Sequence, residues 1–294
     1  MNAPALGWHG SRVDTAVAAI ERDGYCILRR AADPAQVCAI AADFAPRFER
    51  MGRCDGPFFG RNTKRFHALL TRSGHSADFV LNRLVLEIVD RLLLPYCDRV
   101  QLNLTQAIEI LPGERAQAPH RDQDMWQRPV PGIEYLVNVM WPLGAFTAAN
   151  GATRMWPGTH RQLDVKRPPL EEAVAAEMEP GDALLYLGSV VHGGGANVSA
   201  GPRRGMVVSY ALGWLKQFEN MSLTYPPAVA RTFPPKLADL IGYRCHVGTL
   251  GNFDGRCPSS LLSGDYDELE GAREVMPPQH AAVLEHFAAA QAWP

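Results

Sequence analysis

The hydrophobic pattern of the chain changes character near residue 100. Before that point, apolar residues recur at spacings of three and four, which is typical of helices with one buried face. A first helix is expected from Ser11, a favourable N-cap residue, to Gly24. The next stretch, GYCILRR, predicts a short strand.

Two further helices are expected before residue 100. Asp33 and Pro34 form a cap followed by a first-turn proline, which indicates a helix ending near Gly52. Ser76 begins the other helix, which Pro95 closes. The first part of the chain is therefore predicted to be mainly helical.

From about residue 100 to residue 215 the period shortens to that of strands. Four β-rich runs are separated by Gly and Pro: VQLNLTQAIEIL, EYLVNVMWPL, GDALLYLGSVVH and RGMVVSYALGW. Short strands with turn signals between them are typical of a sandwich or barrel and argue against a parallel α/β sheet. The chain is expected to be mainly β with flanking helices.

The expected domain organisation is a single domain over residues 1–294. It has a helical part at about 1–99, a β core at about 100–215 and a mixed C-terminal extension at about 216–294. Within the extension, Pro234 and Pro235 favour a helix ending at Gly242, and HAAVLEHFAAAQA predicts a last helix.

Composition and charge narrow the class of protein. The net charge of −2 provides no general attraction for nucleic acid or an anionic membrane. No apolar run approaches the ~18 residues that span a bilayer. The N-terminus lacks the pattern of a signal peptide, and the six cysteines contain no CxxC pair. These features favour a reduced, cytoplasmic protein without membrane or nucleic-acid partners.

The first candidate chemistry lies in the stretch PHRDQDMW, which contains His120 and Asp122. In a strand, alternate residues share a face, so both side chains would point the same way from a strand end. An imidazole and a carboxylate on one face make two thirds of a facial site for ferrous iron. Taken alone, the pair is weak evidence for a metal site, because His-x-Asp is common by chance and a polar turn between strands explains it.

The candidate third ligand is His192, which follows the predicted strand ALLYL and precedes three glycines. Such glycines let backbone or a cofactor approach closely because no Cβ intervenes. A histidine in a hairpin turn that caps a carbonyl is the alternative. His160, in PGTHR, is the rival ligand, but its position after a Pro-Gly turn indicates exposure to solvent.

Arg203 follows His192 by eleven positions, at the start of the last predicted core strand. A guanidinium at the mouth of a sheet can bind a carboxylate through two parallel hydrogen bonds. Strand alternation directs only one of Arg203 and Arg204 inward. Arg204 is expected to belong to a solvated basic edge.

Together, His120-x-Asp122, His192 and Arg203 resemble the motif set of the phytanoyl-CoA dioxygenase family of iron(II)/2-oxoglutarate oxygenases. DGYCILRRAADPAQVCAI is similar to the family's opening strand and helix, and NGATRMWPGTH is similar to its mid-domain turn. The resemblance spans about Asp23 to Trp214. The segment that follows is loosely similar to members acting on complex natural products.

The resemblance implies a double-stranded β-helix, the jelly roll of cupin-like proteins, with Fe(II) bound by His120, Asp122 and His192. It implies that Arg203, with a hydroxyl contact from Thr153, binds the co-substrate 2-oxoglutarate. O2 would convert 2-oxoglutarate to succinate and CO2 while an unactivated C–H bond is oxidised. Hydroxylation is favoured over desaturation, epoxidation or rearrangement, and the carboxylate of Asp122 argues against halogenation.

Aromatic and sulfur side chains near the motifs suggest the substrate. Met125, Trp126 and Phe146 are the candidate pocket residues, although such residues near strands also serve as plain core. A pocket of this kind fits a lipophilic small molecule, such as a secondary metabolite. An acyl-CoA is an alternative substrate, but the sequence has no cluster of Lys and Arg suited to its phosphates. A homodimer is also compatible with the sequence.

Two other classes of protein compete with the oxygenase. A non-catalytic jelly-roll module that only binds a ligand would be expected to have a broken triad or no arginine. A zinc hydrolase would need a general base beside the ligands. Glu114 and Glu134 are too far along the chain to be assigned that role from sequence.

Overall fold

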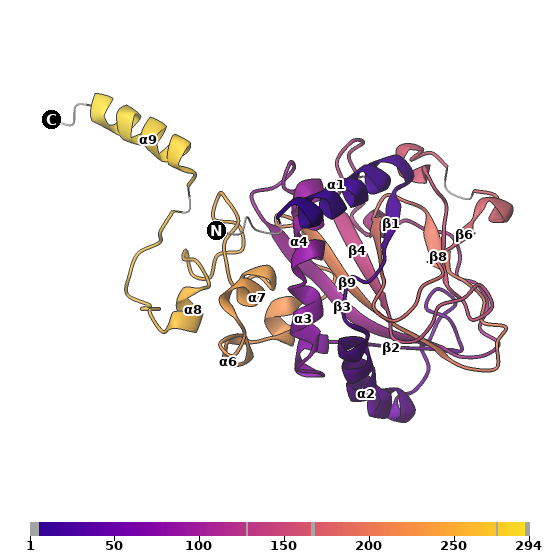
Figure 1. Ribbon diagram of the computed structural model, residues 1–294. Coiled ribbons are helices and arrows are strands. Elements are labelled where there is room, and N and C mark those ends of the chain that lie inside the picture. Colours follow the sequence, from indigo (N-terminus) through magenta and orange to yellow (C-terminus); the bar gives the residue numbers. More distant parts are fainter. Residues whose placement is uncertain (1–5, 128, 166–167, 275, 292–294) are drawn as a thin grey trace, which may run out of the picture.

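Strands far apart in the sequence pair to form two antiparallel sheets (Figure 1). The structure, a computed structural model, describes residues 6–127, 129–165, 168–274 and 276–291. In spatial order, the larger sheet consists of β1 (Tyr25–Leu28), β7 (Ala183–Leu187), β4 (Leu136–Pro142), β9 (Arg203–Leu212), β3 (Val100–Ile110) and β2 (Thr63–His67). The smaller sheet consists of β6 (Val174–Ala175), β5 (Thr153–Met155) and β8 (His192–Gly194).

The long strands β3 and β9 form the centre of the larger sheet. Their register runs from Val100 opposite Leu212 to Ile110 opposite Arg203, with an irregularity at Asn103. This pairing places the start of β9 at the end of β3, beside the loop that leads to residue 120. The expectation of a mainly β protein with flanking helices is confirmed.

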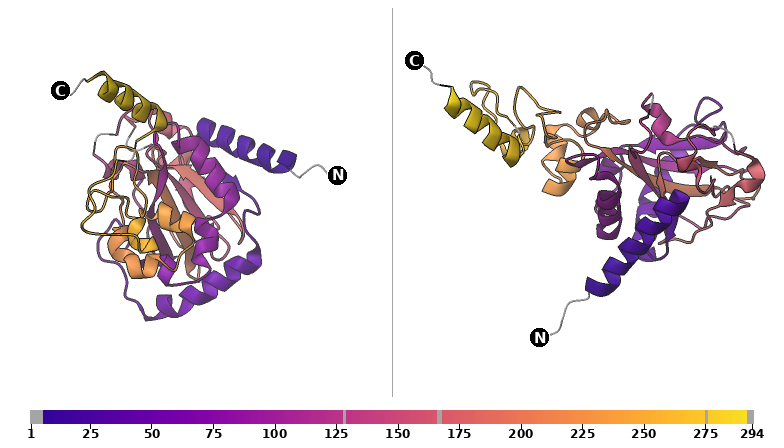
Figure 2. Two further views of the ribbon diagram at one scale, coloured as in Figure 1. Left: turned by 90° about the vertical axis from the view of Figure 1, so that its left-hand side faces the viewer. Right: turned by 90° about the horizontal axis from the view of Figure 1, so that it is seen from above.

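Four helices cover one face of the larger sheet, which we call the outer face; the opposite face is the inner face. The helices are α1 (Leu6–Asp23), α2 (Pro34–Arg50), α3 (Ser76–Val80) and α4 (Arg83–Leu93). Figure 2 shows these indigo and purple helices on the same side of the sheet. Their apolar stripes join the outward side chains of the strands in one hydrophobic cluster.

Two helix predictions differ from the structure in detail. The first helix begins at Leu6, not at Ser11, and so continues through Gly7 and Gly10 in spite of their low helix propensity. The single helix expected from Ser76 to Pro95 is wrong: it is divided into α3 and α4. Asn82 causes the division, since its side chain accepts from Val85 N at the start of α4 and donates to Ala31 O.

The helix α2 follows its sequence signals closely. Asp33 accepts from Ala35 N, and the Gln36 side chain accepts from Asp33 N, so a capping box begins the helix. Pro34 occupies the first turn, where it has no hydrogen bond to lose. The buried Val37, Ile40, Phe44 and Phe48 form its core face.

The described residues of the C-terminal extension form five helices: α5 (Met221–Thr224), α6 (Pro227–Ala230), α7 (Pro235–Leu240), α8 (Ser260–Ser263) and α9 (Pro278–Ala290). The helices expected after Pro234 and near residue 280 are confirmed as α7 and α9. Figure 1 shows α9 in yellow, apart from the sheets. Among the described helices, none has the length and apolar character needed to cross a bilayer.

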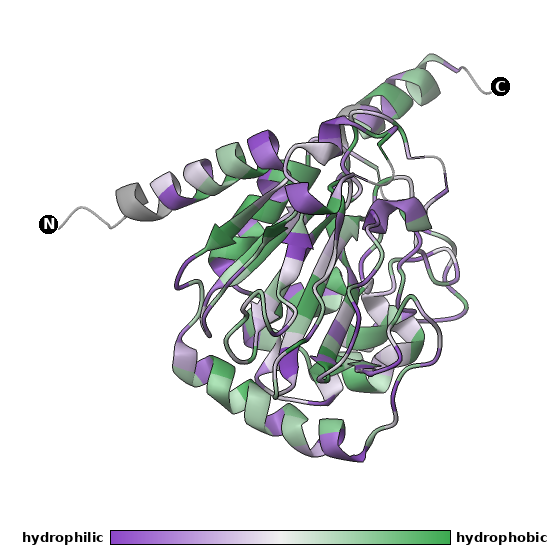
Figure 3. Ribbon diagram, turned by 90° about the vertical axis from the view of Figure 1, so that its right-hand side faces the viewer, coloured by the Kyte–Doolittle hydropathy of each residue, from purple (hydrophilic) through white to green (hydrophobic). Residues whose placement is uncertain are grey.

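Side-chain alternation sorts each strand of the larger sheet between its two faces. In β4, Val137, Val139 and Trp141 belong to the cluster under the helices, whereas Asn138 and Met140 line a cavity on the inner face. Figure 3 shows the resulting mixture of hydrophobic and hydrophilic positions along the strands. The outer face therefore holds the main core, and the inner face carries polar side chains that line the cavity.

Candidate active site

A cavity of about 870 Å³ opens on the inner face. Its lining comes from β2, β3, β4, β8 and β9 and from the loops around residues 57–63 and 113–118. His120, Asp122 and His192 all face this space. The three candidate ligands, which lie up to 72 positions apart in the sequence, thus belong to one cavity.

The three side chains converge closely. Asp122 Oδ1 lies 3.4 Å from His120 Nε2, and Asp122 Oδ2 lies 3.3 Å from His192 Nε2. One ligand atom of each residue lies within 4.8 Å of the others, and no other group of three such residues is found in the described chain. Two imidazoles and one carboxylate at this spacing fit a facial site for ferrous iron.

Backbone pairing holds the two histidines together. His120 N donates to His192 O at 3.0 Å, and His192 N donates to His120 O at 2.9 Å. The pair was expected at a strand end, and His120 does form an isolated bridge with His192, but Asp122 begins a short 3₁₀ helix, η2 (Asp122–Met125). The turn into η2, not strand alternation, directs its carboxylate toward both imidazoles.

Hydrogen bonds around the ligands orient them for metal binding. His120 Nδ1 lies 2.9 Å from Ala118 O, and His192 Nδ1 lies 3.2 Å from Val190 O. An Nδ1–H donor to these carbonyls leaves each Nε2 as a lone-pair donor. Asn138 Nδ2 donates to Asp122 Oδ2 at 2.7 Å and fixes the carboxylate.

Electrostatics favour an ionised carboxylate in this centre. Burial by itself raises the pKa of Asp122, but the opposing charges and hydrogen bonds of His192 and His120 hold that pKa well below its usual range. Burial likewise lowers the pKa of His120, but Asp122 outweighs it and the net shift is upward. The donor set therefore attracts positive charge, which fits a divalent cation.

Arg203 lines the same cavity. It is a buried cation that has no carboxylate partner among the described residues. Its Nη2 donates to Thr153 Oγ1 at 3.2 Å, and its Nε has no partner. The guanidinium stacks on the Phe146 ring, 3.8 Å from the centroid. Burial lowers the pKa of Arg203 to about 9. A ligand carboxylate would neutralise this group.

Phe146 reaches this position because Gly205 leaves space for it. A Cβ on Gly205 would lie 2.7 Å from Phe146 Cζ, closer than such atoms approach in proteins. Phe146 is fully buried and does not line the cavity. Its geometry indicates support of Arg203, in place of the substrate contact expected from sequence.

The neighbouring Arg204 points to the outer face, as alternation requires. The solvated basic edge expected for it is wrong, since Arg204 Nε lies 2.7 Å from the buried carboxylate of Glu109. Two adjacent arginines therefore differ in kind. Arg204 forms a structural ion pair with Glu109, whereas Arg203 faces the cavity and has no counter-ion among the described residues.

A second unpaired cation, Arg65 on β2, was not recognised in the sequence. Arg65 lines the cavity, donates from Nη1 to Gln106 Oε1 at 3.0 Å, and has an unpartnered Nε. The positive charge of Arg65 is one of the causes that lower the pKa values of His120 and Arg203, so Arg65 lies close enough to both to act on them electrostatically. The polar run TKRFH gave no apolar alternation, so the strand that carries Arg65 was missed.

Apolar side chains surround the mouth of the cavity. Phe58, Phe59, Met125 and Phe218 line it and are substantially exposed. The Phe58 ring meets the imidazole of His120 edge-on at 4.9 Å between centroids. Trp126, in contrast, is not among the lining residues: it donates to Lys216 O and packs near Tyr135.

The rival residues occupy other places. His160 Nε2 lies 3.1 Å from Glu21 O and is not part of the triad. Glu134 is outside the cavity lining, and its carboxylate accepts from Ser189 Oγ. Glu114 lines the cavity, but it accepts from Asn62 N, just before β2, and from Oγ1 of Thr63, the first residue of β2. These contacts, at the start of β2, assign Glu114 a structural role and not that of a hydrolytic base.

Comparisons with known proteins show the family to which the chain belongs. A family described as phytanoyl-CoA dioxygenase (PhyH) matches residues 20–205. The dioxygenase FrzG of Cladobotryum sp is 29% identical over 254 residues, covering 77% of this chain and 83% of FrzG. The multifunctional dioxygenase ausE of Aspergillus calidoustus is 31% identical over 261 residues, covering 81% of this chain and 87% of ausE.

Solved structures show the same fold at low sequence identity. The epimerase SnoN, solved in complex with Fe3+, alpha ketoglutarate and nogalamycin RO, has a TM-score of 0.57 and 16% identity, with 70% of this chain and 85% of SnoN covered. HygX from Streptomyces hygroscopicus, solved with nickel and 2-oxoglutarate, has a TM-score of 0.54 and 15% identity, with coverage of 70% and 89%. The expected double-stranded β-helix is confirmed.

The fold and the cavity with its two histidines and one aspartate define a 2-oxoglutarate-dependent non-haem iron dioxygenase. The chain belongs to the phytanoyl-CoA dioxygenase family.

Proposed function

We propose that this dioxygenase hydroxylates an unactivated C–H bond of a lipophilic small molecule, in the manner of an enzyme that modifies secondary metabolites. The observation that carries the proposal is the presence, in one cavity, of the His120, Asp122 and His192 cluster and of two cationic side chains without carboxylate partners among the described residues. These are the groups that a metal ion and a dicarboxylate require.

In this proposal, His120, Asp122 and His192 hold the iron. The residues fit the metal because both Nε2 atoms are left as lone-pair donors and the carboxylate is ionised. Bound iron would supply the activation of O2 that 2-oxoglutarate oxidation drives. Asn138 keeps the Asp122 carboxylate oriented through its hydrogen bond to Oδ2.

Arg203 and Arg65 would bind the two carboxylates of 2-oxoglutarate. Arg203 is the deeper group, and its contacts with Thr153 and Phe146 hold it in place, which suits the distal carboxylate. Arg65 lies close enough to the triad to influence the pKa of His120, which suits the carboxylate next to the metal. Loss of one partner of a buried ion pair costs about 3–5 kcal/mol.

The rest of the cavity suits an apolar substrate. Leu104, Ile108, Met140 and Val207 form walls, and Phe58 and Phe218 lie at the mouth. Binding sites for small organic molecules typically enclose about 300–1,000 Å³. The cavity of about 870 Å³ is therefore large enough for 2-oxoglutarate together with a multi-ring metabolite.

The test combines binding and turnover. Anaerobic protein loaded with Fe(II) and 2-oxoglutarate should show a charge-transfer band in the visible, and succinate release should require both. Asp122→Ala should lose about a thousandfold or more of the coupled activity while it keeps the thermal unfolding temperature within a few degrees. Wild-type activity in Asp122→Ala would refute the ligand assignment.

Arg203→Ala and Arg204→Ala form a matched pair for the co-substrate. Loss of the cavity cation should raise the KM for 2-oxoglutarate about a hundredfold, because a charged partner of a buried carboxylate is removed. Arg204→Ala should leave that KM within about twofold. The reverse ranking would contradict the assignment of Arg203.

A further inference from the structure

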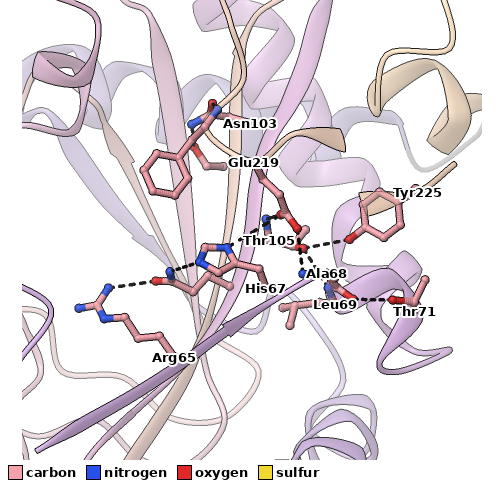
Figure 4. A network of polar contacts seen from close by, with 12 residues as sticks. Arg65, His67, Ala68, Leu69, Thr71, Asn103, Thr105, Glu219 and Tyr225 are labelled. Carbon is pink, nitrogen blue, oxygen red and sulfur yellow. Dashed lines mark hydrogen bonds and ion pairs between the residues drawn. The ribbon is translucent and has the colours of Figure 1, made fainter. Parts of the chain in front are cut away.

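Arg65 is one end of a chain of polar contacts along β2 and β3 (Figure 4). Arg65 and His67 are two positions apart on β2 and share the inner face, and the strand register sets His67 opposite Gln106. Arg65 Nη1 donates to Gln106 Oε1 at 3.0 Å, and Gln106 Nε2 lies 2.9 Å from His67 Nε2. The Gln106 amide thus connects the arginine to the histidine.

Donor and acceptor chemistry fixes the direction of this chain. A guanidinium only donates, so the Gln106 atom that faces Arg65 must be the carbonyl oxygen. The amide NH2 then donates to His67 Nε2, which must be an acceptor. His67 is therefore neutral and carries its proton on Nδ1.

Protonation of His67 would break the chain whichever way Gln106 turns. With a proton on Nε2, the imidazole N–H and the Gln106 NH2 would be two donors facing each other. A flipped Gln106 would satisfy the imidazole but turn its NH2 toward the guanidinium of Arg65, where two donors would face each other. The contact of Arg65 is thus coupled to the protonation state of His67.

The surroundings of His67 favour the neutral form. Burial lowers the pKa of His67, the charge of Arg65 lowers it further, and a backbone contact with Thr105 opposes the shift. The facing acid is Glu219, whose Oε2 lies 4.0 Å from His67 Nδ1. Burial raises the pKa of Glu219.

The far end of the chain is anchored to the backbone. Glu219 accepts from Ala68 N at 2.9 Å and from Thr105 N at 3.1 Å (Figure 4). The ring of Phe218, which lines the cavity, stacks over His67 at 6.1 Å and 27°. The imidazole is therefore packed between the Phe218 ring and the backbone-anchored Glu219.

We propose that Gln106 and His67 are positioning residues that hold the Arg65 guanidinium toward the cavity, and that the chain does so only while His67 is neutral. This inference rests on the proposed role of Arg65 in binding 2-oxoglutarate. Affinity for 2-oxoglutarate then contains an acid-sensitive component that belongs to His67 and is separate from the metal ligands.

The first experiment needs neither metal nor co-substrate. Long-range 1H–15N NMR of metal-free protein, assigned by difference against His67→Gln, should show a neutral His67 with its proton on Nδ1 at pH 7. Gln106→Leu should change the tautomer or mix it. A proton on Nε2, or a doubly protonated ring at pH 7, would overturn the hydrogen-bond chain.

The second experiment measures 2-oxoglutarate binding to the nickel(II)-loaded protein by calorimetry. His67→Leu should raise the Kd about tenfold, because a hydrogen bond to the group that orients a charged side chain is lost. His67→Gln, which keeps an acceptor without a titrating group, should return the Kd to within about threefold of wild type. The wild-type Kd should rise more steeply than that of His67→Gln as the pH falls below about 6.5, because the pKa of His67 lies below its usual value.

In the turnover assay, the same variants should change the KM for 2-oxoglutarate and leave kcat within about twofold. Lys64→Gln, on the same strand but facing Glu109, is the matched control and should leave the Kd unchanged. Equal Kd values for wild type and His67→Leu, or an unchanged Kd in Arg65→Ala, would overturn the positioning role. If wild type itself fails to bind 2-oxoglutarate, the proposed function fails, and the NMR result still decides the hydrogen-bond chain.

Discussion

The two faces of the larger sheet differ in whether their buried charges are paired. On the outer face, the buried Glu109 lies 2.7 Å from Arg204 Nε and 3.3 Å from Lys64 Nζ. On the inner face, Arg65 and Arg203 have no carboxylate within 4.0 Å among the residues described. Unpaired buried charge is costly, so its retention on one face only points to a ligand that completes it there.

The apolar residues show the same division. The outer face joins four helices in a continuous hydrophobic cluster, whereas the inner face interrupts its apolar residues with Asn138, Gln106 and the triad. Stability and chemistry are therefore assigned to successive residues of the same strands. Substitutions at neighbouring positions should separate the two properties.

The largest stability effect is expected for Trp141→Ala, under the helices. Trp141 is fully buried and meets Phe79 edge-on, so its removal should lower the free energy of unfolding by about 3–5 kcal/mol in urea titrations. Met140→Ala is the adjacent control on the cavity side and should cost less than half as much, since one side of Met140 already borders open space. Equal losses would contradict the division between the faces.

A smaller loss is expected for Arg204→Ala. Glu109 keeps Lys64 as a partner, so breaking the ion pair should lower the free energy of unfolding by about 1–3 kcal/mol, below the full cost of a broken buried pair. Arg203→Met should not lower the stability of the metal-free protein, because it removes a buried charge that has no counter-ion. Denaturant unfolding of both variants checks this, and a greater loss for Arg203→Met would reverse the assignment of the faces.

The smallest effect concerns pH and Glu134, an acid outside both charge groups. Burial raises the pKa of Glu134 to about 7, while Ser189 opposes the shift. The folded protein then binds a proton that the unfolded chain has released, so this contribution is full below about pH 4.5 and is lost as pH rises through 7. Glu134→Gln should gain about 1–2 kcal/mol of stability relative to wild type between pH 5.5 and pH 8, measured by urea unfolding at both values. An equal difference in unfolding free energy between variant and wild type at pH 5.5 and pH 8 would contradict the raised pKa of Glu134.

Sequence reasoning recovered the features that rest on strong local patterns. The β-rich runs correspond to β3, β4, β7 and β9 because their apolar residues are buried on both faces, and α2 follows from its cap. The resemblance of His120-x-Asp122, His192 and Arg203 to a family motif set identified the three side chains that converge. Their convergence depends on a backbone bridge and on the turn into η2, which no local pattern shows.

The missing parts share one physical cause. In β2, Lys64 pairs with Glu109 on one face and Arg65 contacts Gln106 on the other, so the strand is stabilised by partners some forty residues away. Its sequence, TKRFH, therefore reads as a polar loop. The break at Asn82 also depends on a distant group, the carbonyl of Ala31. Residues whose structure comes from long-range polar contacts leave no periodic signal.

Gly205 has a consequence for how this enzyme can be altered. The missing side chain gives Phe146 its place, and Phe146 in turn supports the guanidinium of Arg203. A mutant library confined to positions that touch the cavity would omit Gly205, yet a single added methyl group there would displace the Phe146 ring beneath Arg203, the proposed co-substrate anchor. Any attempt to redesign co-substrate preference must therefore include a residue that contacts no ligand at all.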